Sequence, residues 1–387
     1  MESSWKHGRR SSLLTRKESV GLALVFGALG ALLGASGCSD NPTTPGGSGG
    51  SGGESASAST GTSTSTSSGA GGGMTGPVPA ELVAAFDPLG QLPEGLVIDG
   101  TTAYVSFSVL HEVWKVDLVT KTATMWATVP GTLGTAFAQG LAMDAQKNVL
   151  VALQSLDIAV SNPGIYKIAP AGGTATMFAQ APGLNFPRSI TMSPFNTMFV
   201  TAPDPGRVYQ VSMSGTVTEM AVKPNNVAFG WDPASMCLYG MASPMGITSM
   251  VVTGANQDVA DYYWLNADRA ELFLGLLGVD PNGDPQLQEI VPALNGPDCA
   301  TLGGGEGLIK DPKDDTFLYA SRQANKIMRR TKDGDLVVLS EGAGIDAPSA
   351  TAIAEIDGKR YLYFTNSAYK DYNKGGIPSL SRIPLTN

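Results

Sequence analysis

The sequence predicts an all-β protein, a six-bladed β-propeller in which an N-terminal strand closes the last blade. Three observations support this fold. A short phrase, in which a small or polar pair precedes an apolar run, returns six times after residue 92. The second members of the pairs fall at 95, 140, 189, 226, 307 and 350, so most steps are near 40 residues. Each repeat has strand-turn-strand content, and such a period is typical of one blade per repeat.

The phrase is expected to open the innermost strand of each blade. In a propeller these strands face a shared axis, so residues far apart in the sequence meet in one ring. The first member of each pair is therefore a candidate ring residue. The six candidates are Glu94, Gln139, Arg188, Asn225, Glu306 and Ser349.

The first two blades are the clearest in the pattern. Segments 103–108 and 113–118 alternate with a period of two, as half-buried strands do. The run Thr174–Phe178 of blade 2 repeats the run Thr122–Trp126 of blade 1. Blade 6 is one strand short, and the segment Leu82–Gly90 resembles the outer strands of blades 1 and 2. We expect this segment to pair with blade 6 and to cover its open edge.

The fourth repeat has a surplus of about 40 residues, which is roughly one further blade period. Asn266 followed by 267–277 predicts a short capped helix within this surplus. The alternative is that the surplus contains a seventh blade.

Three regions follow from composition. Residues 1–37 combine basic residues, a short apolar stretch and small residues, which is the pattern of a secretory signal peptide. Residues 38–77 are almost entirely Gly, Ser, Thr and Pro, which predicts a disordered tether. Residues 78–387 form the propeller domain.

The end of the signal, Ala35-Ser36-Gly37-Cys38, resembles that of bacterial lipoproteins, which implies cleavage before Cys38 and a lipid on its sulfur. An ordinary secretory signal and, from Arg9-Arg10, twin-arginine export stay open as alternatives. A lipid and a tether predict a membrane-anchored domain. Because Ser39 rather than Asp follows the cysteine, we expect the outer membrane, with the domain facing the periplasm or the cell surface.

The charge balance argues against one class of partner. Residues 1–37 hold five of the 25 basic and two of the 34 acidic residues, so the remainder has a net charge of −12. Such a surface disfavours nucleic acid.

Few residues outside the ring have catalytic chemistry. His111 is the one histidine after residue 37, and Asp204 lies in another loop expected on the ring face. We expect either to be able to carry a proton near the axis. Cys237 and Cys299 are a possible disulfide if the chain is exported, or two buried free thiols.

Carboxylate and amide oxygens that converge from several directions suit a hard cation such as Ca²⁺. Glu94, Asn225 and Glu306 have these oxygens. The phrases Pro93-Glu94-Gly95, Pro224-Asn225-Asn226 and Gly305-Glu306-Gly307 resemble those of the gluconolactonase/regucalcin family of six-bladed propellers. The resemblance implies that these three residues bind a divalent cation, calcium in the first instance.

One departure from that family affects the site. Where the family has Asn at the start of the third blade, this chain has Pro187-Arg188. Arg188 brings a permanent positive charge to the axis, which would satisfy Glu94 and Glu306 without a metal. Two functions therefore stay open: a metal-dependent hydrolase of a small lactone or ester, and a non-catalytic propeller that binds a protein or glycan through its loop face.

Overall fold

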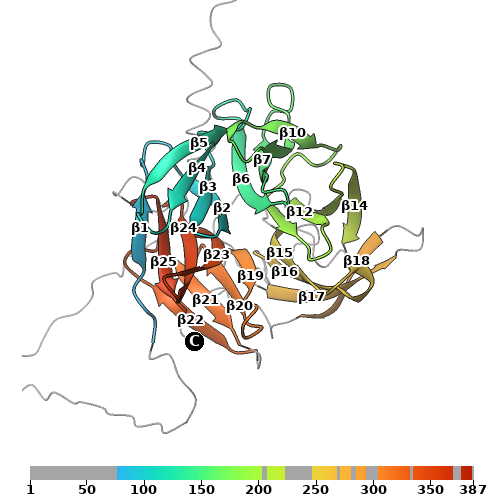
Figure 1. The fold of residues 1–387 in the computed structure, drawn as a ribbon. Coiled ribbons are helices and arrows are strands. Elements are labelled where there is room, and N and C mark those ends of the chain that lie inside the picture. Colours follow the sequence, from blue (N-terminus) through green and yellow to red (C-terminus); the bar gives the residue numbers. More distant parts are fainter. Residues whose placement is uncertain are drawn as a thin grey trace, which may run out of the picture.

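The computed structural model describes residues 76–202, 207–222, 246–267, 271–279, 285–292, 304–331, 334–368 and 376–385. Within these ranges the chain forms six four-stranded blades around one axis, as Figure 1 shows. The six-bladed β-propeller is confirmed. No helix in the described part of the chain is long and apolar enough to cross a membrane.

Each blade is an antiparallel meander that runs outward from the axis. Blade 1 contains β2 (Pro93–Asp99), β3 (Thr102–Phe107), β4 (Glu112–Asp117) and β5 (Ala123–Thr128), with β9 (Gly173–Thr174) added at its edge. Blade 2 contains β6 (Ala136–Met143), β7 (Val149–Ser155), β8 (Gly164–Ile168) and β10 (Thr176–Ala179). Blade 3 contains β11 (Ser189–Met192), β12 (Met198–Ala202), β13 (Arg207–Val211) and β14 (Val217–Val222).

The second half of the ring repeats this order. Blade 4 contains β15 (Ile247–Thr253), β16 (Asp261–Asn266), β17 (Glu271–Val279) and β18 (Pro285–Pro292), with a 3₁₀ turn at Gln257–Val259. Blade 5 contains β19 (Gly305–Lys310), β20 (Phe317–Ser321), β21 (Lys326–Arg330) and β22 (Leu336–Glu341). Blade 6 contains β23 (Pro348–Ile356), β24 (Lys359–Asn366), β25 (Ser379–Pro384) and β1 (Glu81–Ala85).

The first strand of the domain completes the last blade, as predicted. β1 pairs antiparallel with β25, with Glu81 opposite Arg382. Val83 and Phe86 are buried in the hydrophobic cluster that joins blades 6 and 1. The N-terminal segment therefore closes the ring and covers the edge that β25 would otherwise expose.

A repeated irregularity turns the phrase toward the axis. In blades 1, 2, 4, 5 and 6 the pairing between the inner strand and its neighbour shifts register at the phrase. In blade 3 the ladder begins only at Ser189, so Arg188 lies just ahead of it. A bulge re-aims a side chain that regular pleating would direct into the sheet. The first member of each pair can therefore point into the centre of the ring.

The glycines of the phrase allow the inner strands to approach one another closely. A Cβ atom at Gly95 would collide with the carbonyl oxygen of Gln139 in the next blade. A Cβ atom at Gly307 would collide with the carbonyl oxygen of Ser349 in the same way. The Glu-Gly pairs are thus explained by packing at the axis, because only glycine lets the neighbouring backbone come this near.

Blade 4 differs from its predicted form in two respects. Its inner strand is β15, and Thr248 near the start of this strand lines the axial cavity. Asn225 lies outside the described residues. The helix predicted after Asn266 is wrong, because Glu271–Val279 forms strand β17 between β16 and β18.

Candidate functional site

The first members of the phrase meet on the propeller axis. They line a cavity of about 120 Å³ to which the inner strands of all six blades contribute. The predicted ring residues found there are Glu94, Gln139, Arg188, Glu306 and Ser349, and Thr248 is the sixth. Five of the six predicted ring residues thus line one cavity, and the sixth, Asn225, lies outside the described residues.

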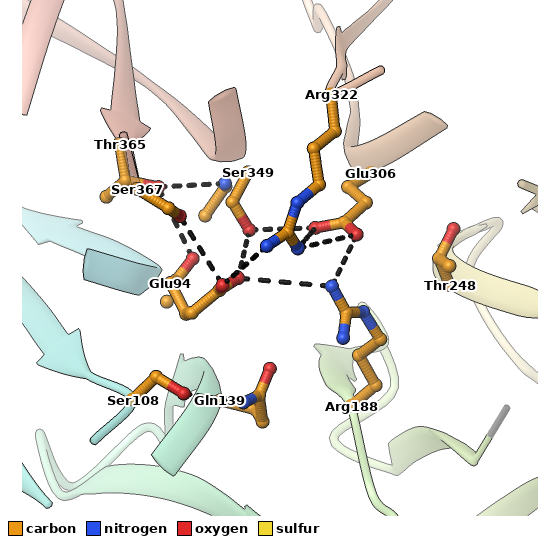
Figure 2. Close-up of polar contacts among 12 residues, drawn as sticks. Glu94, Ser108, Gln139, Arg188, Thr248, Glu306, Arg322, Ser349, Thr365 and Ser367 are labelled. Atoms are coloured by element: carbon orange, nitrogen blue, oxygen red, sulfur yellow. Dashed lines mark hydrogen bonds and ion pairs between the residues drawn. The ribbon is translucent and has the colours of Figure 1, made fainter. Parts of the chain in front are cut away.

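Two arginines and two glutamates form a network of ion pairs at the centre of this ring (Figure 2). Arg188 is hydrogen-bonded to Glu306, and its Nη2 lies 4.0 Å from Glu94 Oε2. Arg322 donates to Glu306 Oε1 at 3.1 Å and to Glu94 Oε1 at 3.2 Å. Each carboxylate therefore contacts both guanidinium groups, and the four formal charges sum to zero.

Two hydroxyl groups complete the coordination of the carboxylates. Ser349 Oγ lies 2.6 Å from Glu94 Oε2 and 2.8 Å from Glu306 Oε2. It has one proton, so it donates to one of the two carboxylates at a time. Ser367 Oγ lies 3.4 Å from Glu94 Oε1. The network thus joins blades 1, 3, 5 and 6 across the axis.

The network sets the ionisation of Glu306. Burial by itself raises the pKa of this carboxyl group. The charges of Arg188 and Arg322 and the hydrogen bonds from Ser349 and Arg322 outweigh that effect and hold the pKa below its ordinary value. Glu306 is therefore an anion at neutral pH.

Arg322 is the ring residue that the sequence pattern did not place at the axis. It follows β20, in the loop between the second and third strands of blade 5, and not in an inner strand. The signal available in the sequence was its position in a loop expected on the ring face. Charge complementarity with Glu94 and Glu306 could have identified it.

Three side-chain hydroxyl groups form hydrogen bonds between neighbouring blades next to the ring residues. Ser106 on β3 accepts a hydrogen bond from the Gly95 amide at 2.8 Å and donates to the Gln139 carbonyl at 2.6 Å. Thr201 and Thr365 form the equivalent bridges from blade 3 to blade 4 and from blade 6 to blade 1. These three bridges tie the phrases of blades 1, 3 and 6 to the next blade and help hold the ring side chains in position.

The other candidate residues do not join this network in the described part of the chain. His111 is 4% exposed, and its Nε2 lies 2.6 Å from the Ala136 carbonyl oxygen. Burial lowers the pKa of His111 against the opposing effect of this hydrogen bond. Asp204, Cys38, Cys237 and Cys299 lie outside the described residues.

The described ring residues do not fit a divalent cation. Glu94 and Glu306 are the two acidic ligands on the axis, and both are already bonded to guanidinium groups. A cation placed between them would be repelled by Arg188 and Arg322 at close range. The described residues contain no group of three or more His, Cys, Asp or Glu side chains that could hold a metal ion.

A patch of apolar side chains lies on the same face as the start of the inner strands. The loop that precedes β6 and the loop between β7 and β8 form it, and they are joined where the Thr132 amide donates to Ser161 Oγ at 2.9 Å. The apolar patch consists of Leu133, Leu156, Ile158 and Val160, which are 54–65% exposed.

Comparison with known proteins supports the fold and leaves the family open. No family model matches the sequence, and no curated protein is similar to it in sequence. Solved structures, however, share the architecture. The calcium-binding protein regucalcin from Agrobacterium tumefaciens is 16% identical, with a TM-score of 0.53 over 80% of this chain and 94% of that chain.

Two further structures are similar to the same extent. A luciferin-regenerating enzyme is 14% identical, with a TM-score of 0.54 over 79% of this chain and 95% of that chain. A putative gluconolactonase is 12% identical, with a TM-score of 0.52 over 80% of this chain and 93% of that chain. At these identities the likeness shows the fold alone.

Proposed function

We propose that this protein is an exported, membrane-anchored propeller that binds a protein partner through its loop face, without metal-dependent hydrolysis on its axis. The observation that carries this proposal is the network of Arg188 and Arg322 with Glu94 and Glu306. Lewis-acid catalysis needs carboxylates that are available to a metal. Here two permanent cations already neutralise them.

The second candidate is a divalent-metal-dependent hydrolase of a small lactone or ester. It is favoured by the shared fold with a calcium-binding regucalcin and a putative gluconolactonase. It would use Glu94, Glu306 and Asn225 as ligands of calcium, with His111 or Asp204 as proton carrier. The arginine contacts of both glutamates argue against it.

The apolar patch supports the choice of a protein as partner. Leu156, Ile158 and Val160 follow one another at alternate positions of one exposed loop, and Leu133 lies on the loop bonded to it. Clustered aliphatic side chains on a surface are typical of protein interfaces. The acidic net charge of the chain favours a neutral or basic partner over an acidic one.

The sequence supports the anchored location. A signal peptide that ends at Cys38 would leave a lipid on that cysteine, and residues 39–77 would connect it to the domain as a tether. We place the domain at the outer membrane, in the periplasm or at the cell surface. A tether of this length leaves the loop face free to meet a partner.

Metal analysis of the purified protein tests the axial part of the proposal. We expect no stoichiometric divalent metal, a melting temperature unchanged by EDTA or Ca²⁺, and no turnover of δ-gluconolactone or p-nitrophenyl acetate above the Glu94→Gln variant. Bound Ca²⁺, a melting temperature that EDTA lowers and Ca²⁺ restores, and turnover lost in Glu94→Gln would establish the hydrolase instead.

Two matched surface variants test the loop face. Ile158→Asp introduces a charge into the apolar patch, whereas Val119→Asp does so at a similarly exposed position in the turn between β4 and β5. A partner captured from envelope extracts should be lost with Ile158→Asp and retained with Val119→Asp. Equal retention by both variants, or elution of the wild-type complex by free glycans, would contradict a protein partner at this patch.

A further inference from the structure

Gln139 has an unused hydrogen-bonding atom at the axis. Its side chain is buried, with the residue 5% exposed, and its Nε2 donates to Ser108 Oγ at 3.1 Å. No described residue donates a hydrogen bond to its Oε1. Figure 2 shows this oxygen directed toward the space between Glu94 and Arg188. This oxygen opens onto the cavity that Gln139 lines, where a ligand that supplies a donor can pair with it.

Arg188 faces the same space, and some of its guanidinium N–H groups have no acceptor among the described residues. Only its Nη2 contacts the carboxylates of Glu306 and Glu94. Among the described residues, none accepts a hydrogen bond from its Nε or Nη1. A guanidinium group has five N–H donors in a fixed plane. The arginine can therefore neutralise the glutamates and donate to a ligand at the same time.

The cavity that Gln139 and Arg188 face has both polar and apolar walls. Beyond the polar ring its walls include Leu96, Leu141, Ile190, Met250 and Leu308. Its volume of about 120 Å³ is close to that of a cavity of about 150 Å³ that holds benzene. The space suits a molecule of about six non-hydrogen atoms with one polar end.

The charge balance of the ring determines which kind of polar group a ligand can place in the cavity. The two arginines and two glutamates already balance, so an anion or a cation would leave an uncompensated charge in a buried site, which is costly. A neutral group that accepts a hydrogen bond from Arg188 and donates one to Gln139 Oε1 pairs with both residues. It also leaves the charge balance of the site unchanged.

We infer that the axial cavity is a binding site for a small uncharged aliphatic amide or a molecule of the same hydrogen-bonding pattern. The carbonyl oxygen accepts from Arg188, the N–H donates to Gln139 Oε1, and the short aliphatic chain lies against the leucine and methionine walls. This site is distinct from the apolar patch and does not depend on the partner proposed for it.

Methionine-methyl NMR on the wild-type protein provides the first test. With ¹³C-methyl methionine, titration with butyramide should shift the Met250 signal, because Met250 lines the cavity, and leave that of Met125, which is 52% exposed on an outer strand, in place. Butyrate, which differs mainly in charge, should bind at least about tenfold more weakly, a difference of about 1.4 kcal/mol. No shift at Met250, or equal binding of butyrate, would overturn the inference.

A variant pair provides the second test. Gln139→Met keeps the length of the side chain but removes the acceptor, and we expect it to weaken butyramide binding by about tenfold. Gln210→Leu removes an amide from β13, outside the cavity, and should leave binding unchanged. Unaltered affinity in Gln139→Met would overturn the role of Gln139, and the wild-type titration decides the matter if that variant does not fold.

Discussion

The guanidinium group of Arg322 in blade 5 donates to Glu94 in blade 1 at 3.2 Å, although 228 positions separate the two residues. Blade 6 stands between these blades in the ring. The bond therefore spans the axis and does not follow the circumference. With Arg188 and Glu306 it makes the centre of the propeller a balanced ionic cluster whose charged members come from blades 1, 3 and 5.

Removing one arginine from this cluster should cost far more than removing one from the surface. Arg188→Ala leaves two buried carboxylates with a single guanidinium group, and we expect a loss of about 3–5 kcal/mol in the free energy of unfolding. Urea denaturation measures it. The matched control is Arg207→Ala, whose partner Glu219 and own side chain are both 43% exposed, with an expected loss of about 0–1 kcal/mol. Similar losses in the two variants would contradict the cluster.

Acid should weaken the cluster through Glu306. Its pKa in the folded protein lies below the ordinary value of 4.5. The stability it contributes is therefore complete above pH 4.5 and is lost as the pH falls through the lower folded pKa. In urea titrations from pH 7 to pH 3, the stability advantage of the wild type over Glu306→Gln should narrow in this range.

Glu81 provides the comparison for this pH experiment. Hydrogen bonds from Arg382 and Lys121 lower its pKa to about 2, yet its side chain is 46% exposed. Solvent screens such a pair, so Glu81→Gln should change stability by about 1 kcal/mol or less at any pH. A larger pH-dependent effect at Glu81 than at Glu306 would show that the axis does not dominate acid sensitivity.

Closure of the ring should depend on β1. A chain that begins at Gln91 lacks this strand and should lose most of its thermal stability, whereas one that begins at Thr75 should melt as the wild type does. Phe86→Ala removes a buried ring that packs on Phe107 with centroids 4.8 Å apart, for an expected cost of about 3–5 kcal/mol. Leu82→Ala alters a side chain that is 52% exposed and should be nearly neutral. Equal melting temperatures for the two truncated chains would refute the closure.

Anchoring should depend on Cys38. Replacement by Ser removes the sulfur that would carry the lipid, so Cys38→Ser should leave the membrane fraction or remain unprocessed. Fractionation and mass determination of the N-terminus measure this. Cys237→Ser should stay in the membrane fraction and serves as the control. An unchanged distribution of Cys38→Ser would remove the basis for a lipid anchor.

The blade repeat and the closing strand could be predicted because both are local patterns. The alternation of Val113–Leu118 and the likeness of Leu82–Gly90 to other outer strands need no knowledge of the distant chain. Ring residues such as Glu94 and Gln139 followed from the same phrase. Both residues lie where the inner strand of their blade shifts register against its neighbour.

The start of β15 was not recognised in the sequence because Thr248-Ser249 lacks the glycine that marks the phrases at Glu94, Gln139 and Glu306. Thr248-Ser249 has a weak signal, and the Asn225 phrase fits the expected spacing better. The apolar run of β17 is short, and such a run does not distinguish a helix from a buried strand. In the folded blade, pairing with β16 and β18 makes this segment a strand, and the sequence alone does not show these partners. Arg322 was missed for a related reason, since its loop position has no periodic signature.

The pairing of β1 with β25 also constrains how the protein can fold. Glu81 is synthesised 301 residues before Arg382, its partner across the ladder. The ribosome therefore completes five blades before the ring can close, and in that interval β1 has no partner strand. Contacts this distant in sequence slow folding. Until β25 is available, the edge that β1 presents to it stays unpaired.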